Sequence, residues 1–214
     1  MKLEIKKDYN LIDYTKAVKF MQNRVFDILN NNKNELIWFL NHDHIYTQGT
    51  SASNKEILVK NNIKTLKTNR GGKTTYHGPG QRITYFMINL NQRKKNIRKF
   101  ITTIEVSLIQ LLNSYNIEAT TFRDRVGIWV IGKNGKKFIK EEKIGAIGLR
   151  LKKWITYHGL SFNINPDMTY YNNISACGLK DYKNTSLEEL GVKVDENEFD
   201  RIYYKIFFQN LEKL

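Results

Sequence analysis

Apolar positions recur at helical spacing in three parts of the chain. Behind Asp13, a suitable N-cap, they mark one face of residues 14–30, and they do so again over residues 97–115. A third such pattern, over residues 199–211, predicts a closing C-terminal helix. We therefore expect three amphipathic helices, each with one face directed at a core.

Strand-like patterns separate these helices. Residues 36–40 are a continuous apolar run of strand length, and residues 83–90 are rich in β-branched and aromatic side chains. The turn Gly-Lys-Asn-Gly at residues 132–135 predicts a hairpin. This order of helices and mostly antiparallel strands is typical of the α+β (mixed α/β) class, and we expect one domain over residues 1–214. The predicted strands are residues 36–40, 62–68, 83–90, 126–131, 136–139, 143–151 and 154–164.

The densest group of glycines lies in residues 69–82, which read N-R-G-G-K-T-T-Y-H-G-P-G-Q-R. Such density indicates tight turns, or a backbone that closely approaches another group. We expect a long polar loop between two strands, where binding groups often lie, and an ornate structural turn is the alternative. Just upstream, Ser53 is expected to cap a short helix over residues 54–61.

Composition narrows the class of protein. Of the 214 residues, 41% are apolar, which is enough for one good core, and no apolar run is long enough to span a membrane. The first residues lack the features of a signal peptide and the single cysteine permits no internal disulfide, so we expect a soluble, cytoplasmic protein. The net charge of +14 indicates an acidic partner. Because the basic residues are dispersed and no nucleic-acid-binding motif is present, an acidic protein fits this charge as well as a nucleic acid does.

Reactive side chains stand in the glycine-punctuated second half of the chain. Cys177 precedes a glycine and is either a presented thiol or a small buried hydrophobe. A nucleophilic thiol needs a helper, for which His77, His158 and Lys143 are the candidates by sequence. Lys143 precedes an uncharged run, so it is either a desolvated base or a strand-end lysine in solvent.

Neither nucleotide nor metal chemistry has a complete motif. The glycine-rich stretch lacks the pattern G-x-x-x-x-G-K-[ST] and precedes a strand, so P-loop and Rossmann interpretations fail. His42 and His44 form an H-x-H pattern, but no third ligand lies close in sequence, and we expect no metal site there.

Four segments carry a resemblance to a known family. They are R-G-G-x-x-T-Y-H-G-P-G-Q from Arg70, K-I-x-A-I-G-x-R from Lys143, Y-H-G-L-x-x-N-x-N from Tyr157, and C-G-L from Cys177, followed by T-S-L. In this order they resemble the octanoyltransferases, the lipoyl(octanoyl) transferases of lipoate biosynthesis. The resemblance covers about residues 36–190, and its first segment is long enough to be highly specific.

The resemblance implies a fold and an activity. The fold would be that of biotin and lipoate protein ligase catalytic domains, a mixed sheet with packed helices. The enzyme would take octanoate from octanoyl-acyl carrier protein and pass it to the ε-amine of a specific lysine. The acceptors would be the lipoyl domains of 2-oxoacid dehydrogenase complexes and the glycine-cleavage H-type protein, with no nucleic acid or membrane as a partner. No cofactor is expected, because the acyl group arrives already activated.

The resemblance also assigns roles to residues. Cys177 would be the acyl-accepting nucleophile, and Lys143 would lower the pKa of the thiol or remove its proton. Two departures from the family pattern stand out: His42-Asp43-His44 replaces the common His-Pro-Pro, and residues 132–142 look longer and more basic than usual. The implied walls of the acyl pocket are Arg70, Gly71, Gly72, Lys73, Thr74, Thr75, Tyr76, His77, Ala146, Ile147, Gly148, Gly159, Leu160 and Ser161.

Three other functions remain as alternatives. An ATP-dependent lipoate or biotin ligase shares the expected scaffold but has no need of a cysteine nucleophile. A basic nucleic-acid-binding module would explain the net charge, and its affinity would fall steeply with salt. A cysteine hydrolase that releases free octanoate is chemically close to the transferase, because water competes with lysine at an acyl-enzyme.

Overall fold

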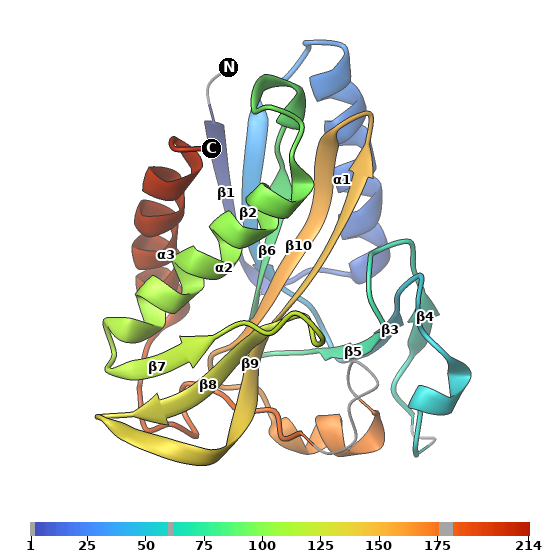
Figure 1. Cartoon of the computed structure of the whole chain (residues 1–214). Coiled ribbons are helices and arrows are strands. Elements are labelled where there is room, and N and C mark those ends of the chain that lie inside the picture. The colour runs from blue at the N-terminus through green and yellow to red at the C-terminus, as the bar shows by residue number, and fades with distance from the viewer. Residues whose placement is uncertain (1–2, 60–61, 176–181) are drawn as a thin grey trace.

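A seven-stranded mixed sheet forms the centre of the protein in a computed structural model, which describes residues 3–59, 62–175 and 182–214 (Figure 1). Its strands are β1 (Leu3–Leu11), β2 (Glu35–Asn41), β6 (Gln81–Met87), β7 (Ile117–Thr120), β8 (Ile128–Lys133), β9 (Lys136–Lys152) and β10 (Ile155–Asn163). They lie in the order β1-β2-β6-β10-β9-β8-β7. Only the pair of β1 and β2 is parallel among them, and the remaining neighbours are antiparallel.

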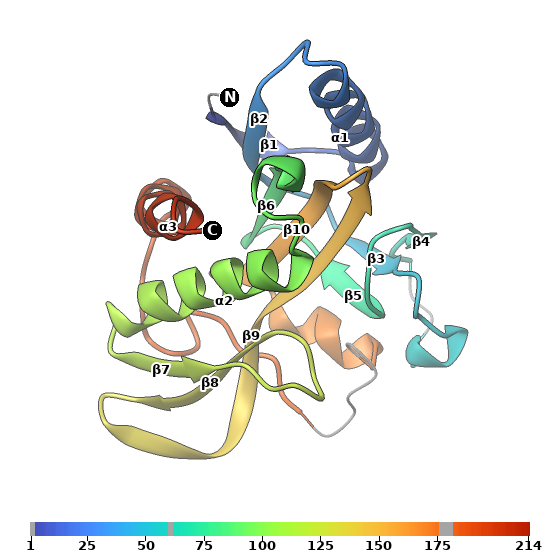
Figure 2. The same ribbon diagram turned by 45° about the horizontal axis from the view of Figure 1, so that its top comes forward.

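A second, smaller sheet packs beside the first. It consists of β3 (Ile45–Gln48), β4 (Thr65–Lys67) and β5 (Thr74–His77) in the order β4-β3-β5. It lies on the opposite side of the molecule from the C-terminal helix (Figure 2). The prediction of one long loop over residues 69–82 is therefore wrong in part, because Thr74–His77 forms a strand against Ile45–Gln48. That partner carried no strand prediction, and pairing with a distant segment leaves no local signal.

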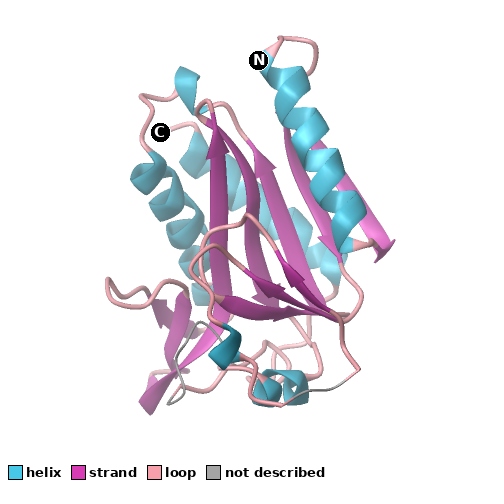
Figure 3. Ribbon diagram, turned by 90° about the vertical axis from the view of Figure 1, so that its right-hand side faces the viewer, coloured by secondary structure: helices cyan, strands magenta, loops and turns pink. Residues whose placement is uncertain are grey.

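Three helices cover the two faces of the large sheet (Figure 3). They are α1 (Tyr14–Leu29), α2 (Ile97–Asn113) and α3 (Glu196–Leu211), as the sequence pattern predicts. The predicted cap of α1 is confirmed, because the Asp13 side chain accepts a hydrogen bond from the Lys16 backbone N–H at 2.9 Å. The short helix predicted over residues 54–61 is only a single 3₁₀ turn, Asn54–Glu56.

The apolar run of β2 is buried along its whole length because the sheet is covered on both faces. Its even-numbered side chains pack against α1, and its odd-numbered ones face α2 and α3. The α1 side of the core comprises Ala17, Met21, Val25, Ile28, Leu36, Trp38, Leu40, Ile83, Tyr85, Met87, Ile155 and Tyr157. The other side is centred on Ile37, Phe39, Phe86, Phe100, Ile104, Leu108, Phe199, Tyr203 and Phe207.

The second half of the sheet differs from the sequence prediction in its strand lengths. Strand β9 is one continuous strand of 17 residues, where two separate strands over residues 136–139 and 143–151 were predicted. Glu142 lies opposite Val130, and the pairing with β8 resumes at Lys137 opposite Gly132 after a register shift, so residues 138–141 form an irregularity within one strand. The hairpin turn is confirmed, with Asn134 and Gly135 both at positive φ. No helix in the described part of the chain is long and apolar enough to cross a membrane.

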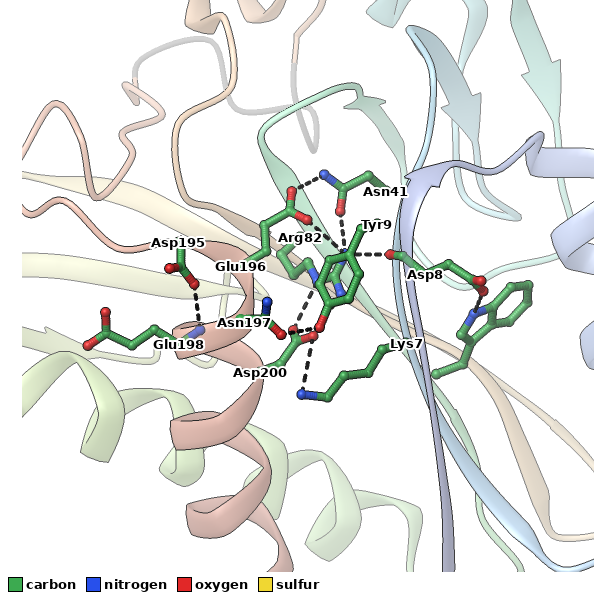
Figure 4. A network of polar contacts seen from close by, with 11 residues as sticks. Lys7, Asp8, Tyr9, Asn41, Arg82, Asp195, Glu196, Asn197, Glu198 and Asp200 are labelled. Carbon is green, nitrogen blue, oxygen red and sulfur yellow. Dashed lines mark hydrogen bonds and ion pairs between the residues drawn. The ribbon is translucent and has the colours of Figure 1, made fainter.

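A buried ion pair joins the sheet to α3 (Figure 4). Arg82 on β6 donates from Nε to Asp200 Oδ1 at 2.9 Å and from Nη2 to Oδ2 at 2.7 Å, and neither side chain is exposed. The remaining Nη1 donates to Asn41 Oδ1 at 2.7 Å and to the Asp8 backbone carbonyl at 2.9 Å. Arg82 thus connects β6 with β1, β2 and α3 through hydrogen bonds that its guanidinium donates.

Replacement of Asp200 by Asn is expected to lower the free energy of unfolding by about 3 kcal/mol, because the Arg82 charge stays buried without its main partner. Urea unfolding measures this change. Lys33→Met is the control, since Lys33 is exposed and its pair with Asp27 is expected to contribute less than about 1 kcal/mol. A loss for Asp200→Asn as small as that for Lys33→Met would contradict the prediction.

Candidate active site

A cavity of about 320 Å³ lies between the glycine-rich segment and strands β6, β9 and β10. Most of the residues that the sequence analysis assigned to the acyl pocket border this one cavity, although they come from three separate stretches of chain. The assigned residues that line it are Arg70, Gly71, Gly72, Lys73, Thr75, His77, Lys143, Ala146, Ile147, Gly148, Gly159, Leu160 and Ser161.

Two assigned residues, Thr74 and Tyr76, are not among those that line the cavity. Successive side chains of a strand point to opposite faces, so on β5 the cavity receives Thr75 and His77 instead. Tyr76 packs against other aromatic rings, with its centroid 5.0 Å from that of Tyr170. Cys177, the expected nucleophile, lies outside the described residues.

Close backbone contact forms one wall of the cavity. A Cβ atom added to Gly148 would lie 2.9 Å from the Gly71 carbonyl oxygen, and one added to Gly71 would lie 3.0 Å from the Leu149 carbonyl oxygen. Larger residues at these two positions would force the Arg-Gly-Gly segment away from β9. The two glycines, which the resemblance assigns to the pocket, therefore set the distance between the Arg-Gly-Gly segment and β9.

Arg70 holds the shape of the glycine-rich segment. Its guanidinium donates to the Thr47 backbone carbonyl at 2.6 Å, the Lys73 carbonyl at 2.7 Å and the Gly71 carbonyl at 2.9 Å. Its Nε also donates to Thr47 Oγ1 at 3.0 Å. These bonds join β3 to the turn before β5, so Arg70 borders the cavity and fixes the backbone on this side of it.

Lys143 is a buried lysine at the cavity wall. Its relative exposure is 5%, so the interpretation as a strand-end lysine in solvent is wrong. The Nζ atom donates to the Val126 backbone carbonyl at 2.8 Å and lies 5.4 Å from the centroid of the Trp129 ring. The backbone of Lys143 is also fixed, because its N–H donates to the Lys183 carbonyl and its C=O accepts from the Thr185 N–H, each at 2.8 Å.

A cluster of buried histidines and tyrosines borders the same cavity. Tyr14, His77, Tyr85 and His158 line the cavity, and His42 packs behind them with its ring centroid 5.0 Å from that of Tyr14. Tyr14 and Tyr85 were not identified from the sequence, because each lies in a regular element with no motif around it. Of the H-x-H pair, His42 Nε2 is bonded to Tyr85 Oη at 2.7 Å.

Burial keeps these histidines neutral. It lowers the pKa of His42 from 6.5 to about 4 and that of His158 to about 3, and it places the pKa of His77 well below its ordinary value. His77 Nδ1 donates to Gln81 Oε1 at 2.7 Å, and His158 Nε2 donates to Asn69 Oδ1 at 2.9 Å. Among the described residues, no three side chains of His, Cys, Asp or Glu come together as metal ligands.

Comparison with known proteins identifies the family. The model of the lipoyl protein ligase A/B catalytic domain matches residues 13–208. Curated octanoyltransferases match at 40–48% identity; that of Wolbachia pipientis wMel is 48% identical over 92% of this chain and 96% of its own. The chain belongs to the octanoyltransferase family. It is accordingly an enzyme of the acyltransferase class.

Solved structures agree with the expected fold. A crystal structure of lipoate-protein ligase A bound with ATP has a TM-score of 0.69 at 14% identity, over 99% of this chain and 86% of that chain. A bipartite lipoate protein ligase from Thermoplasma acidophilum, studied with its E2 lipoyl domain, has a TM-score of 0.63 at 13% identity, over 97% and 84%. The prediction of a lipoate and biotin ligase type of scaffold for this octanoyltransferase-family chain is confirmed.

The buried histidines predict that the octanoyltransferase fold loses stability as pH falls below about 6.5. The unfolded chain binds protons at His42, His77 and His158 from that pH downward, whereas the folded chain excludes them until about pH 4 or lower. Each contributes up to about 1.4 kcal/mol per pH unit to the slope.

Urea unfolding between pH 7 and pH 5.5 measures this slope before carboxylates such as Glu4, whose ordinary pKa is 4.5, begin to contribute. The variant His42→Gln removes one of the three groups and should give a shallower slope. A stability that is constant over this range would show that the folded and unfolded chains bind protons equally at the three histidines, and an unchanged slope in His42→Gln would show this for His42.

Proposed function

We propose that the protein transfers an octanoyl group from octanoyl-acyl carrier protein to the ε-amine of a lysine on lipoyl domains, through a thioester at Cys177. The observation that carries this proposal is the cavity itself. It joins three of the four sequence segments that resemble the family motifs, and the buried Lys143 lines it. Family membership supports the octanoyltransferase activity, and the donor, the acceptor and the intermediate are inferences from it.

The size and lining of the cavity suit a saturated acyl chain. A volume of about 320 Å³ is in the range of small-molecule pockets, and its walls include Ile83, Ile147 and Leu160 beside glycine backbone. Each CH₂ group that leaves water on binding contributes about 0.8 kcal/mol. An eight-carbon chain thus gains most of its affinity from burial, with little need for directed polar contacts.

The chemistry proceeds in two balanced steps. In the first, the Cys177 sulfur attacks the donor thioester carbonyl, the bond from that carbonyl to the carrier sulfur breaks, and the thiol proton passes by way of Lys143 to the departing carrier thiolate. In the second, the acceptor lysine amine attacks the Cys177 thioester and forms an amide. The amine proton returns by way of Lys143 to the Cys177 thiolate, so the enzyme is regenerated and no oxidant or nucleotide is consumed.

The charge of the protein supports acidic partners. A net charge of +14 raises the encounter rate with negatively charged proteins and makes that rate sensitive to salt. The proposal takes lipoyl domains and the glycine-cleavage H-type protein as acceptors. The Thermoplasma ligase, described together with its E2 lipoyl domain, supports this choice of acceptor class.

Intact-mass measurement with octanoyl-acyl carrier protein alone tests the intermediate. We expect a mass increase of one octanoyl group in the wild type, none in Cys177→Ala, and an acylation rate at least tenfold lower in Lys143→Ala. Lys136→Ala is the control, because Lys136 is an exposed lysine on the same strand. Equal acylation in Cys177→Ala would disprove the thioester mechanism, and transfer seen only with ATP and free octanoate would indicate a ligase.

Addition of a lipoyl domain then decides between transferase and hydrolase. We expect the octanoyl group to leave the enzyme and to appear on one lysine of the acceptor. Release of free octanoate at the same rate with and without the acceptor would instead identify a cysteine hydrolase.

The position of the acyl chain is tested by Ala146→Leu. Ala146 lines the cavity beside Ser161 on the neighbouring strand, so a larger side chain occupies space that the chain needs. We expect the acylation rate with an octanoyl donor to fall at least tenfold, and the rate with a butyryl donor to fall much less. Equal losses with both donors would place the acyl chain elsewhere.

A further inference from the structure

The hydrogen-bond acceptor of the Lys143 amine belongs to a loop and not to a strand. Residues 121–127 connect β7 to β8, and the Val126 carbonyl in this loop accepts from Lys143 Nζ at 2.8 Å. The next residue, Gly127, has φ +140°, and a Cβ atom there would overlap the Lys143 Cε atom. The loop backbone and the lysine side chain are therefore in direct contact, and the position of one determines that of the other.

An aromatic cage around Arg125 holds this loop. The guanidinium carbon lies 3.8 Å from the ring centroid of Phe122, 4.7 Å from that of Tyr182 and 5.2 Å from that of Trp129. Arg125 also forms ion pairs with Glu141 on β9 and with the neighbouring Asp124. Contacts of a guanidinium with ring faces are strongest when they are withdrawn from water, and this side chain is only 13% exposed.

Trp129 connects the cage to the lysine. The fully buried ring contacts both cations, with the Arg125 carbon 5.2 Å and Lys143 Nζ 5.4 Å from its centroid. The indole N–H donates to the Arg125 backbone carbonyl at 3.2 Å. Trp129 is also the register partner of Lys143 across β8 and β9. Arg125, Trp129 and Lys143 thus form one packed unit.

We propose that Arg125 is a positioning residue for the Lys143 amine. The cage fixes residues 121–127 so that the Val126 carbonyl stays where the amine donates to it, and Lys143 is held in one orientation at the cavity. This inference rests on the proposed function, in which Lys143 carries the proton. Arg125 also borders the cavity, so a direct contact with substrate is the alternative that the experiment must separate.

The different chemistry of arginine and lysine explains why position 125 carries an arginine. Fixing a lysine side chain in one rotamer costs about 2 kcal/mol of conformational entropy. When the Val126 carbonyl already holds the Lys143 amine, this cost is met on folding and not during the reaction. A guanidinium is planar, weakly hydrated and able to stack on an aromatic ring, whereas an ammonium is a compact, strongly hydrated charge. Lysine in place of Arg125 would keep the charge and lose the stacking, so the two substitutions report on different properties.

The first experiment measures acylation by octanoyl-acyl carrier protein in single turnovers over a range of donor concentrations. We expect Arg125→Met and Arg125→Lys each to lower the maximal rate at least tenfold, with the half-saturating donor concentration changed less than threefold. Arg123→Met is the matched control in the same loop, because Arg123 is exposed, and its rate should match the wild type. Full activity in Arg125→Met, rescue by Arg125→Lys, or an effect confined to half-saturation would overturn the proposal.

A second readout is independent of activity. Brief treatment with limiting acetic anhydride, followed by peptide mapping, reports how accessible each lysine amine is. We expect modification of Lys143 to rise at least threefold in Arg125→Met and to stay unchanged in Arg123→Met. If the wild type forms no acyl adduct but this labelling difference is found, the proposed function fails and the positioning role stands; if labelling is unchanged, the positioning role fails.

Thermal unfolding of each variant excludes global loss of structure as the cause. Should Arg125→Met not fold, Phe122→Leu removes the nearest ring of the cage and keeps the arginine. It is expected to change the maximal rate and the Lys143 labelling in the same direction and by a smaller factor. A folded Phe122→Leu variant with wild-type rate and labelling would also overturn the proposal.

Discussion

The burial of one amine constrains the site more than any other feature. A lysine that is only 5% exposed needs partners for its nitrogen, since a buried polar group without them costs free energy. The Val126 carbonyl accepts a hydrogen bond from this nitrogen, and the Trp129 ring lies close to it. Both residues lie where β8 begins. The conformation of the loop before β8, its glycine at positive φ and the ring of aromatic residues behind it are therefore tied to a single side chain.

The opposite wall of the cavity follows from a second constraint, the contact of backbone with backbone. The Arg-Gly-Gly segment approaches β9 through Gly71 and Gly148, and Arg70 holds the segment in that position by donating to three backbone carbonyls. On this side the cavity is bounded by backbone, so its width changes little when side chains rotate.

Sequence patterns predict the elements whose signals are local. The helices α1, α2 and α3 and the buried strand β2 follow from periodicity and capping, because each has one face or both faces in the core. Strands β1, β3 and β7 lack such a signal, since β1 is an edge strand with exposed residues such as Tyr9 and Leu11, and β3 is defined by its partners. For the same reason β5 was assigned to a loop.

The candidate site shows the same division. Motifs bring Arg70, Lys143 and Gly159 to attention, and the structure gathers them around one cavity. Tyr14 and Arg125 carry no motif of their own, and their proximity to the cavity depends on the packing of elements that are distant in sequence. Thr74 and Tyr76, in contrast, belong to a motif but do not line the cavity, because alternate side chains of β5 point to the other face of the strand.

One consequence concerns motion at Lys143. Strand β9 pairs with β8 at this residue, and residues 183–185 occupy its other edge through two hydrogen bonds. Both backbone polar groups of Lys143 are therefore engaged, and the strand cannot shift there without breaking sheet pairing. Any displacement of the amine is confined to four side-chain torsions, which exchange on the timescale of rotamer changes rather than that of domain opening.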